Sequence, residues 1–285
     1  MAMDPEALLA RSFPVLRHAY TARDSIIYAL GIGLGEDPLD AGQLRYVYEA
    51  GLQAVPSLAN VLGYPGFWVQ DADTGIDWRR VVHAEQSFVL HRTLPPAGVV
   101  VAQTRLVGLY DKGAEKGALL CQERVVRDEA SGAALATVSQ VSMLRGDGGR
   151  GGMMGAPPPP HVVPERPADA TCDLPTLRQS ALIYRLSGDL NPLHVEPAVA
   201  AAAGFPRPIL HGMCTMGVAC HAALRTLLDY DAGAFRGMRV RFTAPVLPGE
   251  TIRTELWRDG DVVSFRSHVV ERGVVVLNAG RIDVG

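Results

Sequence analysis

The sequence has 285 residues, of which 48% are hydrophobic and 20% charged, and its 27 basic and 30 acidic side chains give a net charge of −3. This length suits one large domain or two smaller ones, and the composition is that of an ordinary globular protein. The slight negative charge gives no support for nucleic-acid binding, because there is no excess of basic groups to attract phosphates.

The sequence predicts neither a membrane-spanning segment nor a secretory signal. No apolar run reaches the roughly 18–20 residues that span a bilayer, and Asp4 and Glu6 interrupt the N-terminus where a secretory signal would be apolar. Four cysteines lack the spacing of a zinc site or of a redox CxxC pair: Cys121, Cys172, Cys214 and Cys220. We therefore expect mostly buried, reduced thiols, a cytoplasmic location and no membrane segment.

The first half of the chain predicts one poor helix followed by strands. An apolar segment ends at residues 28–31 and runs into GEDPLD, residues 35–40. The helix candidate at 52–63 carries Pro56, which costs about 3 kcal/mol inside a helix. Four β-rich segments follow, at residues 86–90, 99–110, 119–128 and 133–144.

Glycine and proline dominate the middle of the chain, GDGGRGGMMGAPPPP. Gly makes such a segment pliable and a Pro run extends it as polyproline II, so residues 146–160 are predicted to be a linker. The predicted organisation is an N-terminal unit at 1–145, the linker, and a C-terminal unit at 161–285.

The second half predicts a long helix followed by an antiparallel sheet. Helical spacing covers residues 174–186, and residues 212–230 form the one long helix candidate. Asp-Gly and Arg-Gly turns separate the last strands of four β-rich segments, at residues 238–244, 250–257, 262–270 and 274–283. A sheet wrapped around one helix is therefore expected.

Both halves share an order of motifs, which indicates an internal repeat. Tyr-x-Leu-Gly and then GEDPLD in the first half match Tyr-x-Leu-Ser and then GDLNPLH in the second, and each half later has a strand that runs into a Pro-Gly corner. The fold class predicted from this repeat is α+β, with the first helix degenerate.

The stretch YRLSGDLNPLH, residues 184–194, places a carboxylate and an imidazole five positions apart, at Asp189 and His194. Such a pair can move a proton to or from a water molecule. Pro192 stiffens the turn between them, and Asn191 offers both a donor and an acceptor. The alternative is an ordinary helix stop, because Ser-Gly-Asp and Asn-Pro are common turn sequences. The corresponding turn of the first half has no such pair, which favours chemistry over turn formation.

Gly212 opens the predicted long helix. The first N–H groups of a helix have no intrahelical acceptor, and the helix dipole makes this end positive. A glycine there allows a ligand carbonyl to approach the backbone, as an oxyanion hole requires. The alternative is that Gly212 merely begins the helix.

These motifs resemble a known family. YRLSGDLNPLH with GFPRPILHG, and RFTAPVLPGETIRTELW near the C-terminus, closely resemble the signature of the hydratase 2 group of the MaoC-like, double hot-dog family, the (R)-specific 2-enoyl-CoA hydratases. In the first half the resemblance covers YTARDSIIYALGIG, LRYVYE, HAEQSFVLHRTLPPAG and YDKG. It spans nearly the whole chain.

The resemblance implies a pair of hot-dog units with one active site, in the second unit. Asp189 and His194 would activate a water that adds to C3 of a trans-2-enoyl thioester, Asn191 would orient the site, and the Gly212 N–H would stabilise the thioester oxygen. Further ligand contacts are implied at His83, Ala84, Lys112, Leu190, Pro192, Leu193 and Phe242. Ala84 stands where the family usually has Gly, which puts the substrate fit on that side in doubt.

The resemblance further implies that no metal or redox cofactor is needed, since coenzyme A enters as part of the substrate. The degenerate first helix would leave room for a long or bulky acyl tail, and a homodimer is expected. Two alternatives remain: another hot-dog hydratase, dehydratase or thioesterase, and a non-catalytic acyl-thioester-binding module. A thioesterase usually needs a carboxylate on the hot-dog helix, and residues 212–228 contain none.

Overall fold

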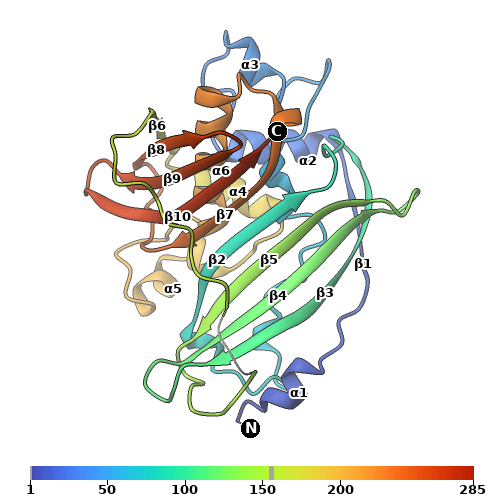
Figure 1. The fold of residues 1–285 in the computed structure, drawn as a ribbon, viewed down its shortest axis with the longest axis vertical. Helices are drawn as coiled ribbons and strands as arrows, with labels where there is room; N and C mark the ends of the chain where they lie inside the picture. Colours follow the sequence, from blue (N-terminus) through green and yellow to red (C-terminus); the bar gives the residue numbers. More distant parts are fainter. Residues whose placement is uncertain (1, 154–156) are drawn as a thin grey trace.

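Ten antiparallel strands form a single sheet in this computed structural model, which describes residues 2–153 and 157–285. Residues 154–156 of the predicted linker lie outside the described residues. The order across the sheet is β1-β3-β4-β5-β2-β7-β10-β9-β8-β6 (Figure 1). The strands of the N-terminal unit are β1 (Leu16–Tyr20), β2 (Val81–Leu90), β3 (Gly98–Asp111), β4 (Ala118–Asp128) and β5 (Ala134–Leu144). Those of the C-terminal unit are β6 (Ala170–Pro175), β7 (Phe235–Phe242), β8 (Thr251–Asp259), β9 (Val262–Val269) and β10 (Val274–Val284).

The helices lie between the first and second strands of each unit, apart from the N-terminal α1. In the N-terminal unit they are α1 (Pro5–Leu9), α2 (Ala22–Gly31), α3 (Ala41–Leu44), η1 (Pro56–Asn60), η2 (Trp68–Gln70) and η3 (Trp78–Arg80). In the C-terminal unit they are α4 (Ser180–Tyr184), η4 (Arg185–Ser187), η5 (Pro192–His194), α5 (Pro197–Ala202), α6 (Gly212–Leu227) and η6 (Ala232–Ala234).

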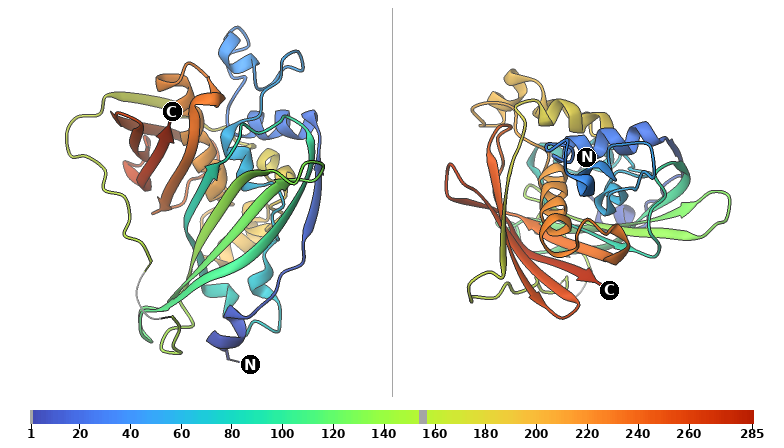
Figure 2. Two further views of the ribbon diagram at one scale, coloured as in Figure 1. Left: turned by 45° about the vertical axis from the view of Figure 1, so that its right-hand side comes forward. Right: turned by 90° about the horizontal axis from the view of Figure 1, so that it is seen from above.

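The two units repeat one topology. The N-terminal strands run 1-3-4-5-2 across the sheet, and the C-terminal strands run 6-8-9-10-7 when counted from the opposite edge. Each strand therefore has a counterpart at the same place in the other unit, as an internal repeat requires. This is the predicted α+β double hot-dog fold, and the helices gather on one side of the curved sheet (Figure 2).

The seam between the units is the antiparallel pairing of β2 with β7. Its register joins Glu85 to Arg241 and Phe88 to Met238, and Arg241 also forms an ion pair with Glu85 across the seam. On the inner face, the rings of Phe88 and Phe235 stack at 5.9 Å between centroids. One continuous sheet results, and one large hydrophobic core includes residues of both units.

The central helices of the two units are unequal. In α6, twelve of sixteen residues are buried, from Met213 to Leu224. The counterpart in the N-terminal unit is η1, five residues of 3-10 helix that begin at Pro56. Proline is tolerated at the start of a helix but not inside one, so this residue limits the element to a short turn. The predicted degeneracy of the first helix is confirmed.

Two sequence-based expectations were wrong in detail. Residues 174–186 do not form one helix, because 170–175 pair with β8 as the edge strand β6 and only 180–184 are α-helical. The edge strand β1 was also not predicted. These two edge strands have only five and six residues, so each offers too few positions for a pattern of alternation to stand out from its surroundings.

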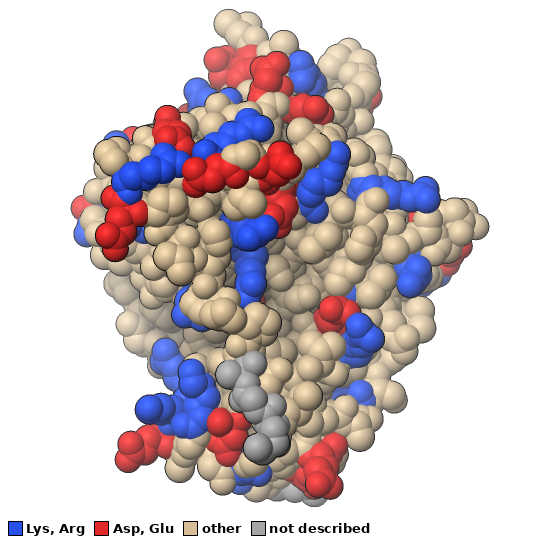
Figure 3. All heavy atoms as spheres, in the orientation of Figure 1, with Lys and Arg blue, Asp and Glu red and all other residues tan. Residues whose placement is uncertain are grey.

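Part of the predicted linker is held in place by hydrogen bonds. The backbone N–H groups of Gly149 and Gly151 donate to the Asp111 carboxylate at 2.8 and 2.7 Å. Further on, the indole of Trp257 donates to the Arg166 carbonyl, so residues 157–169 run along the outer side of the C-terminal sheet (Figure 2). On this face acidic and basic side chains are interspersed (Figure 3).

The sequence also predicted no membrane segment and mostly buried, reduced cysteines. Within residues 2–153 and 157–285, no helix combines the length and apolar character that crossing a bilayer demands. All four cysteines are free thiols, and three of them are buried: Cys172, Cys214 and Cys220.

Helix α6 packs closely against the N-terminal unit at Gly217. A Cβ atom at this position would lie 2.5 Å from Cγ2 of Ile32 and 3.3 Å from the hydroxyl oxygen of Tyr28. The thiol of Cys214, one turn earlier, donates to the carbonyl of Gly31 at 3.3 Å. Glycine in a helix interior lowers helix stability by about 1 kcal/mol relative to alanine, so its presence here reflects the close contact.

We expect Gly217→Ala to lower the free energy of unfolding by about 1–2 kcal/mol, because overpacking outweighs the gain in helix propensity. Urea unfolding measures this. Ile32→Ala removes the opposing methyl group, so the alanine at 217 should be much less harmful in the double variant. A stabilised Gly217→Ala protein would show that the two units are not in close contact here.

Candidate active site

The loop that carries Asp189 and His194 is shaped by its own short-range hydrogen bonds. Gly188 ends η4 with φ +113°, a conformation that side chains disfavour. The Asp189 carboxylate then accepts from the Asn191 N–H at 3.2 Å, and the Asn191 side-chain oxygen accepts from the Leu193 N–H at 3.0 Å. Pro192 begins η5, which ends at His194. The sequence between the acid and the base therefore forms a rigid double turn.

Asn191 helps to shape the loop. Its side-chain oxygen caps η5 by accepting from the Leu193 N–H. The amide oxygen has a second lone pair and the Nδ2 group is a donor, so both stay available to a ligand. The side chain thus holds the turn that places Asp189 and His194, and its expected role in orienting the site stays a prediction.

His194 has a defined tautomer. Its Nδ1 atom lies 2.8 Å from the carbonyl oxygen of Ile209, and a carbonyl only accepts hydrogen bonds, so Nδ1 carries the proton in the neutral ring. Nε2 is left with its lone pair as a proton acceptor. Burial lowers the pKa of His194, against the opposing effects of the Ile209 hydrogen bond and the Asp189 charge. The ring is therefore neutral and basic at Nε2 near neutral pH.

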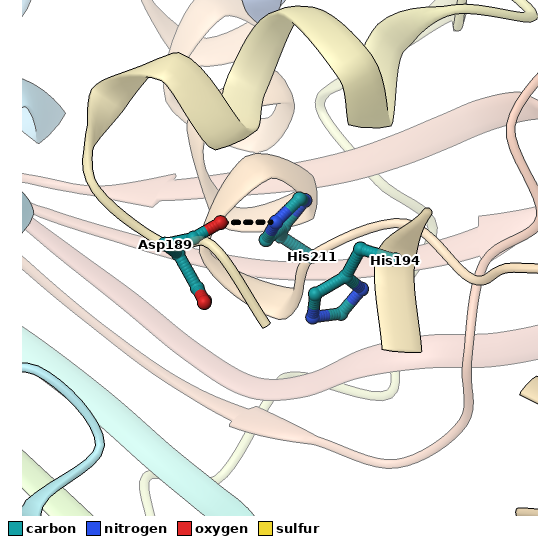
Figure 4. A group of neighbouring side chains, drawn as sticks. All are labelled: Asp189, His194 and His211. Atoms are coloured by element: carbon teal, nitrogen blue, oxygen red, sulfur yellow. Dashed lines mark hydrogen bonds between the residues drawn. The ribbon is translucent and has the colours of Figure 1, made fainter. Parts of the chain in front are cut away.

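His211 is a member of the site that sequence reasoning treated only as a helix start. It lies directly before α6, is 1% exposed, and stacks on His194 with ring centroids 3.7 Å apart and planes at 28°. Its Nε2 atom donates to the backbone carbonyl of Asp189 at 3.2 Å (Figure 4). The His211 ring thus contacts both residues: it donates to the backbone of Asp189 and stacks on the ring of His194.

The charge state of His211 follows from this position. Burial, together with the neighbouring His194, lowers the pKa of His211 to about 4. A neutral ring with its proton on Nε2 leaves Nδ1 as a bare acceptor, and this atom is buried without a partner among the described residues. The signal in the sequence was the unusual His-Gly pair at the start of the long helix.

Asp189, His194 and His211 each place one polar atom within 4.8 Å of the other two. No direct hydrogen bond joins the Asp189 carboxylate to His194 among the described residues, and this spacing suits a bridging water. Such a trio also has the composition of a metal site. A metal binds imidazole through a lone pair in the ring plane, however, and two nearly parallel stacked rings do not direct their lone pairs at one point. The geometry therefore favours a water.

Gly212 and Phe242 lie at the start of α6. Because Gly212 is the first residue of the helix, its N–H has no intrahelical acceptor. The Phe242 ring lies 3.2–3.4 Å from the point where a side chain of Gly212 would begin. His83, on β2 of the other unit, meets the same ring edge-on with centroids 4.8 Å apart. The β2–β7 seam thus brings His83, Gly212 and Phe242 together, and their expected contacts with a ligand stay predictions.

The other expected ligand contacts are less closely connected. Ala84 lies where the β2–β5 register shifts, and Leu190, at 62% exposed, lies beside the Asp189 turn. Lys112 is exposed in the β3–β4 turn, with its N–H bonded to the Gly117 carbonyl. No contact among the described residues connects Lys112 to Asp189 or His194, so its proposed place against a phosphate depends on the ligand.

A pocket of about 340 Å³ adjoins the Asp189 loop. Its walls are Gly188 and the residues before it, the helix α2, the strand β1 and the segment 58–64 that follows from η1. The shortened helix η1 therefore borders a cavity. A larger hollow of about 750 Å³ lies under residues 160–168, and none of the predicted site residues lines it.

Comparison with known proteins gives two adjacent family matches. Residues 18–146 match the profile of the MFE-2 hydratase 2 N-terminal domain, and residues 161–279 match that of the MaoC like domain. The chain is 40% identical to the enoyl-CoA hydratase ChsH3 of Mycobacterium tuberculosis, over 91% of each chain. It is 36% identical to the peroxisomal enoyl-CoA hydratase 2 of Arabidopsis thaliana, over 98% of this chain and 94% of the relative.

Solved structures agree with these matches. A MaoC-like dehydratase from Phytophthora capsici superposes with a TM-score of 0.87 at 32% identity, over 98% of each chain. The full-length peroxisomal multifunctional enzyme type 2 of Drosophila melanogaster gives a TM-score of 0.82 at 34% identity, over 95% of this chain and 48% of that one.

The lowered pKa values of three histidines predict how the free energy of unfolding depends on pH. Burial lowers the pKa of His83, His211 and His221 to about 4, whereas an unfolded histidine titrates near 6.5. The unfolded chain therefore binds more protons between these values, so stability is complete above about pH 6.5 and falls as the pH drops towards about 4. Urea midpoints across this range measure the effect. His221→Gln should flatten the dependence, exposed His91→Gln should not, and a midpoint independent of pH would contradict the assignment.

Proposed function

The chain belongs to the MaoC-like family, in its hydratase 2 group, and on that premise we propose that it adds water reversibly to a trans-2-enoyl-CoA to give the (R)-3-hydroxyacyl-CoA. The observation that carries the proposal is that Asp189, His194 and His211 gather their polar atoms within 4.8 Å of one another, and that His211 directly precedes Gly212, whose N–H begins α6. Such a site has both the acid–base pair and the oxyanion donor that the reaction requires.

The proposed mechanism uses one water molecule between Asp189 and His194. One member of the pair takes a proton from the water as its oxygen bonds to C3 of the enoyl thioester. Negative charge moves through the conjugated system to the thioester oxygen, where the Gly212 N–H and the positive end of α6 stabilise it. The proton then passes to C2, and the thioester carbonyl re-forms. The reverse sequence is the dehydration.

Supporting residues hold this arrangement in place. His211 fixes the Asp189 backbone and packs on the His194 ring, while Asn191 holds the turn between them. His83 and Phe242 form the wall beside Gly212. We propose that the acyl tail extends into the 340 Å³ pocket between the Asp189 loop and the N-terminal unit, and that Lys112 meets a phosphate of coenzyme A.

The proposed reaction uses no metal or redox cofactor, since all the proton transfers lie within the reach of the pair and its water. A cytoplasmic location and a homodimer also stay predictions. Size-exclusion chromatography with light scattering tests the second of them.

The central test follows loss of the ultraviolet absorbance of the conjugated thioester when the protein is mixed with trans-2-enoyl-CoA of short, medium and branched chains. We expect turnover, a product oxidised only by an (R)-specific 3-hydroxyacyl-CoA dehydrogenase, and an unchanged rate after dialysis against EDTA. No turnover with any chain, or an (S) product, would overturn the proposed function. A rate lost with EDTA and restored by a divalent cation would instead assign the Asp189–His194–His211 trio to a metal.

Variants of the pair test the residues. Asp189→Asn and His194→Gln should each lower kcat by at least about 10², the scale of lost acid–base catalysis, with an unchanged melting temperature. His161→Gln is the matched control, because His161 bonds Ser264 under the linker, away from the Asp189 loop. Near-normal turnover in either variant of the pair would place the acid–base chemistry elsewhere.

A further inference from the structure

The inner face of the N-terminal sheet carries polar residues where its fold needs apolar ones. In β4 the buried positions alternate through Ala118, Leu120, Gln122, Arg124 and Val126. Gln122 is 7% and Arg124 is 4% exposed. A strand that covers a core normally keeps this face apolar, so the two polar residues call for a partner.

Arg124 has few of its five donors satisfied. One Nη2–H donates to the Asn60 carbonyl at 2.8 Å, and Nε is buried without a partner. None of the carboxylates in the described part of the chain lies within ion-pair distance of it, although many other arginines form such pairs. Directly opposite on β3, the Thr104 hydroxyl is also buried and unpartnered.

The guanidinium stays charged in this environment. Burial lowers the pKa of Arg124 to about 10, which still leaves it protonated at neutral pH. A buried cation without a counter-ion is strongly unfavourable for folding, and natural sequences keep one mainly where a ligand or another charge compensates it. Among the described residues, its partners are the Asn60 carbonyl and the face of the Tyr64 ring, whose centroid lies 6.0 Å from the guanidinium carbon, and neither carries a negative charge.

The polar groups around Arg124 do not compensate it either, because they satisfy one another. Gln86 donates to the side-chain oxygen of Asn60 at 2.9 Å, and Gln122 donates to Gln140 at 3.1 Å. The oxygen of Gln122 accepts from the Trp68 indole at 2.8 Å. The side-chain oxygens of Asn60, Gln122 and Gln140 thus accept hydrogen bonds from other side chains, and Arg124 donates to none of them.

The position of Arg124 relates it to the acyl pocket. Arg124 lines a small cavity with Asn60, Tyr64 and Met213, the residue that follows Gly212. Tyr64 lines both this cavity and the 340 Å³ pocket beside the Asp189 loop. The cavity itself has a volume of about 10 Å³, which is room for one water. A group larger than one water needs more room than this cavity has, and Tyr64, whose ring lies under the guanidinium, is the side chain that separates it from the 340 Å³ pocket.

We propose that Arg124 is an anion subsite beside the acyl pocket, behind Tyr64, and that the preferred enoyl-CoA carries a carboxylate at the end of its acyl chain. This specificity rests on the proposed hydratase function. A carboxylate matches the guanidinium in charge and in its paired acceptors, and Thr104 supplies a further donor. A methyl-ended chain would leave the same cation buried and unpaired.

Binding of saturated acyl-CoA thioesters tests the subsite without any need for catalysis. Calorimetry compares methyl-ended with carboxylate-ended thioesters of equal chain length, over a series of lengths. We expect the carboxylate-ended ligand to bind at least about tenfold more tightly at the best length, as one satisfied charge-assisted interaction implies. Arg124→Met should abolish that preference, and Arg105→Met is the control, since Arg105 is exposed on β3 and paired with Glu123.

Melting temperature separates this specificity from a structural role. Arg124→Met replaces a buried unpaired charge with an apolar side chain, so we expect it to melt no lower than the wild type. Arg124→Gln keeps a donor for the Asn60 carbonyl and should lose the preference in the same way. The proposal is overturned if the wild type favours methyl-ended ligands at every length, or if Arg124→Met weakens both ligand types equally. A failed hydration assay with the carboxylate preference intact would reject the hydratase function alone.

Discussion

The pairing of β2 with β7 is the constraint on which the rest of this molecule depends. A hot-dog unit alone has an open sheet edge, and in the N-terminal unit the short η1 replaces the long central helix. Joining the two edges makes one ten-stranded sheet and lets α6 contact elements of both units. The same seam brings His83 of one unit against Phe242 of the other, beside Gly212. The proposed site thus exists only in the joined pair.

The two copies of the repeat differ in their central helix and in the turn before it. The second copy keeps a full central helix, whose start offers an unpaired N–H, and adds Asp189 and His194 in the turn before it. The first copy gives up that helix, and a pocket lies along the segment that replaces it. A long central helix and a tail pocket compete for the same space inside a hot-dog sheet. Duplication lets the protein have both.

Polar groups buried near the site have two different physical explanations. His194 and His211 are neutral rings, and each uses one nitrogen to hold a backbone carbonyl, so their burial is compatible with a stable loop. Arg124 is a charged group with one acceptor in the structure. The first arrangement leaves a neutral acceptor, Nδ1 of His211, without a partner, whereas the second leaves a charge without a counter-ion, and we propose that a ligand supplies it. This contrast is the physical basis for assigning catalysis to one cluster and specificity to the other.

The sequence by itself determined the repeat, the long helix, predicted at 212–230 and found at 212–227, most strands and the Asp189–His194 pair, because alternation, helical spacing and turn chemistry are local. It missed the edge strands β1 and β6, which are only five and six residues long. Only the tertiary structure decided that His211 stacks on His194 and that Arg124 is buried without a carboxylate. Those facts depend on contacts between residues distant in the chain, which no local pattern records.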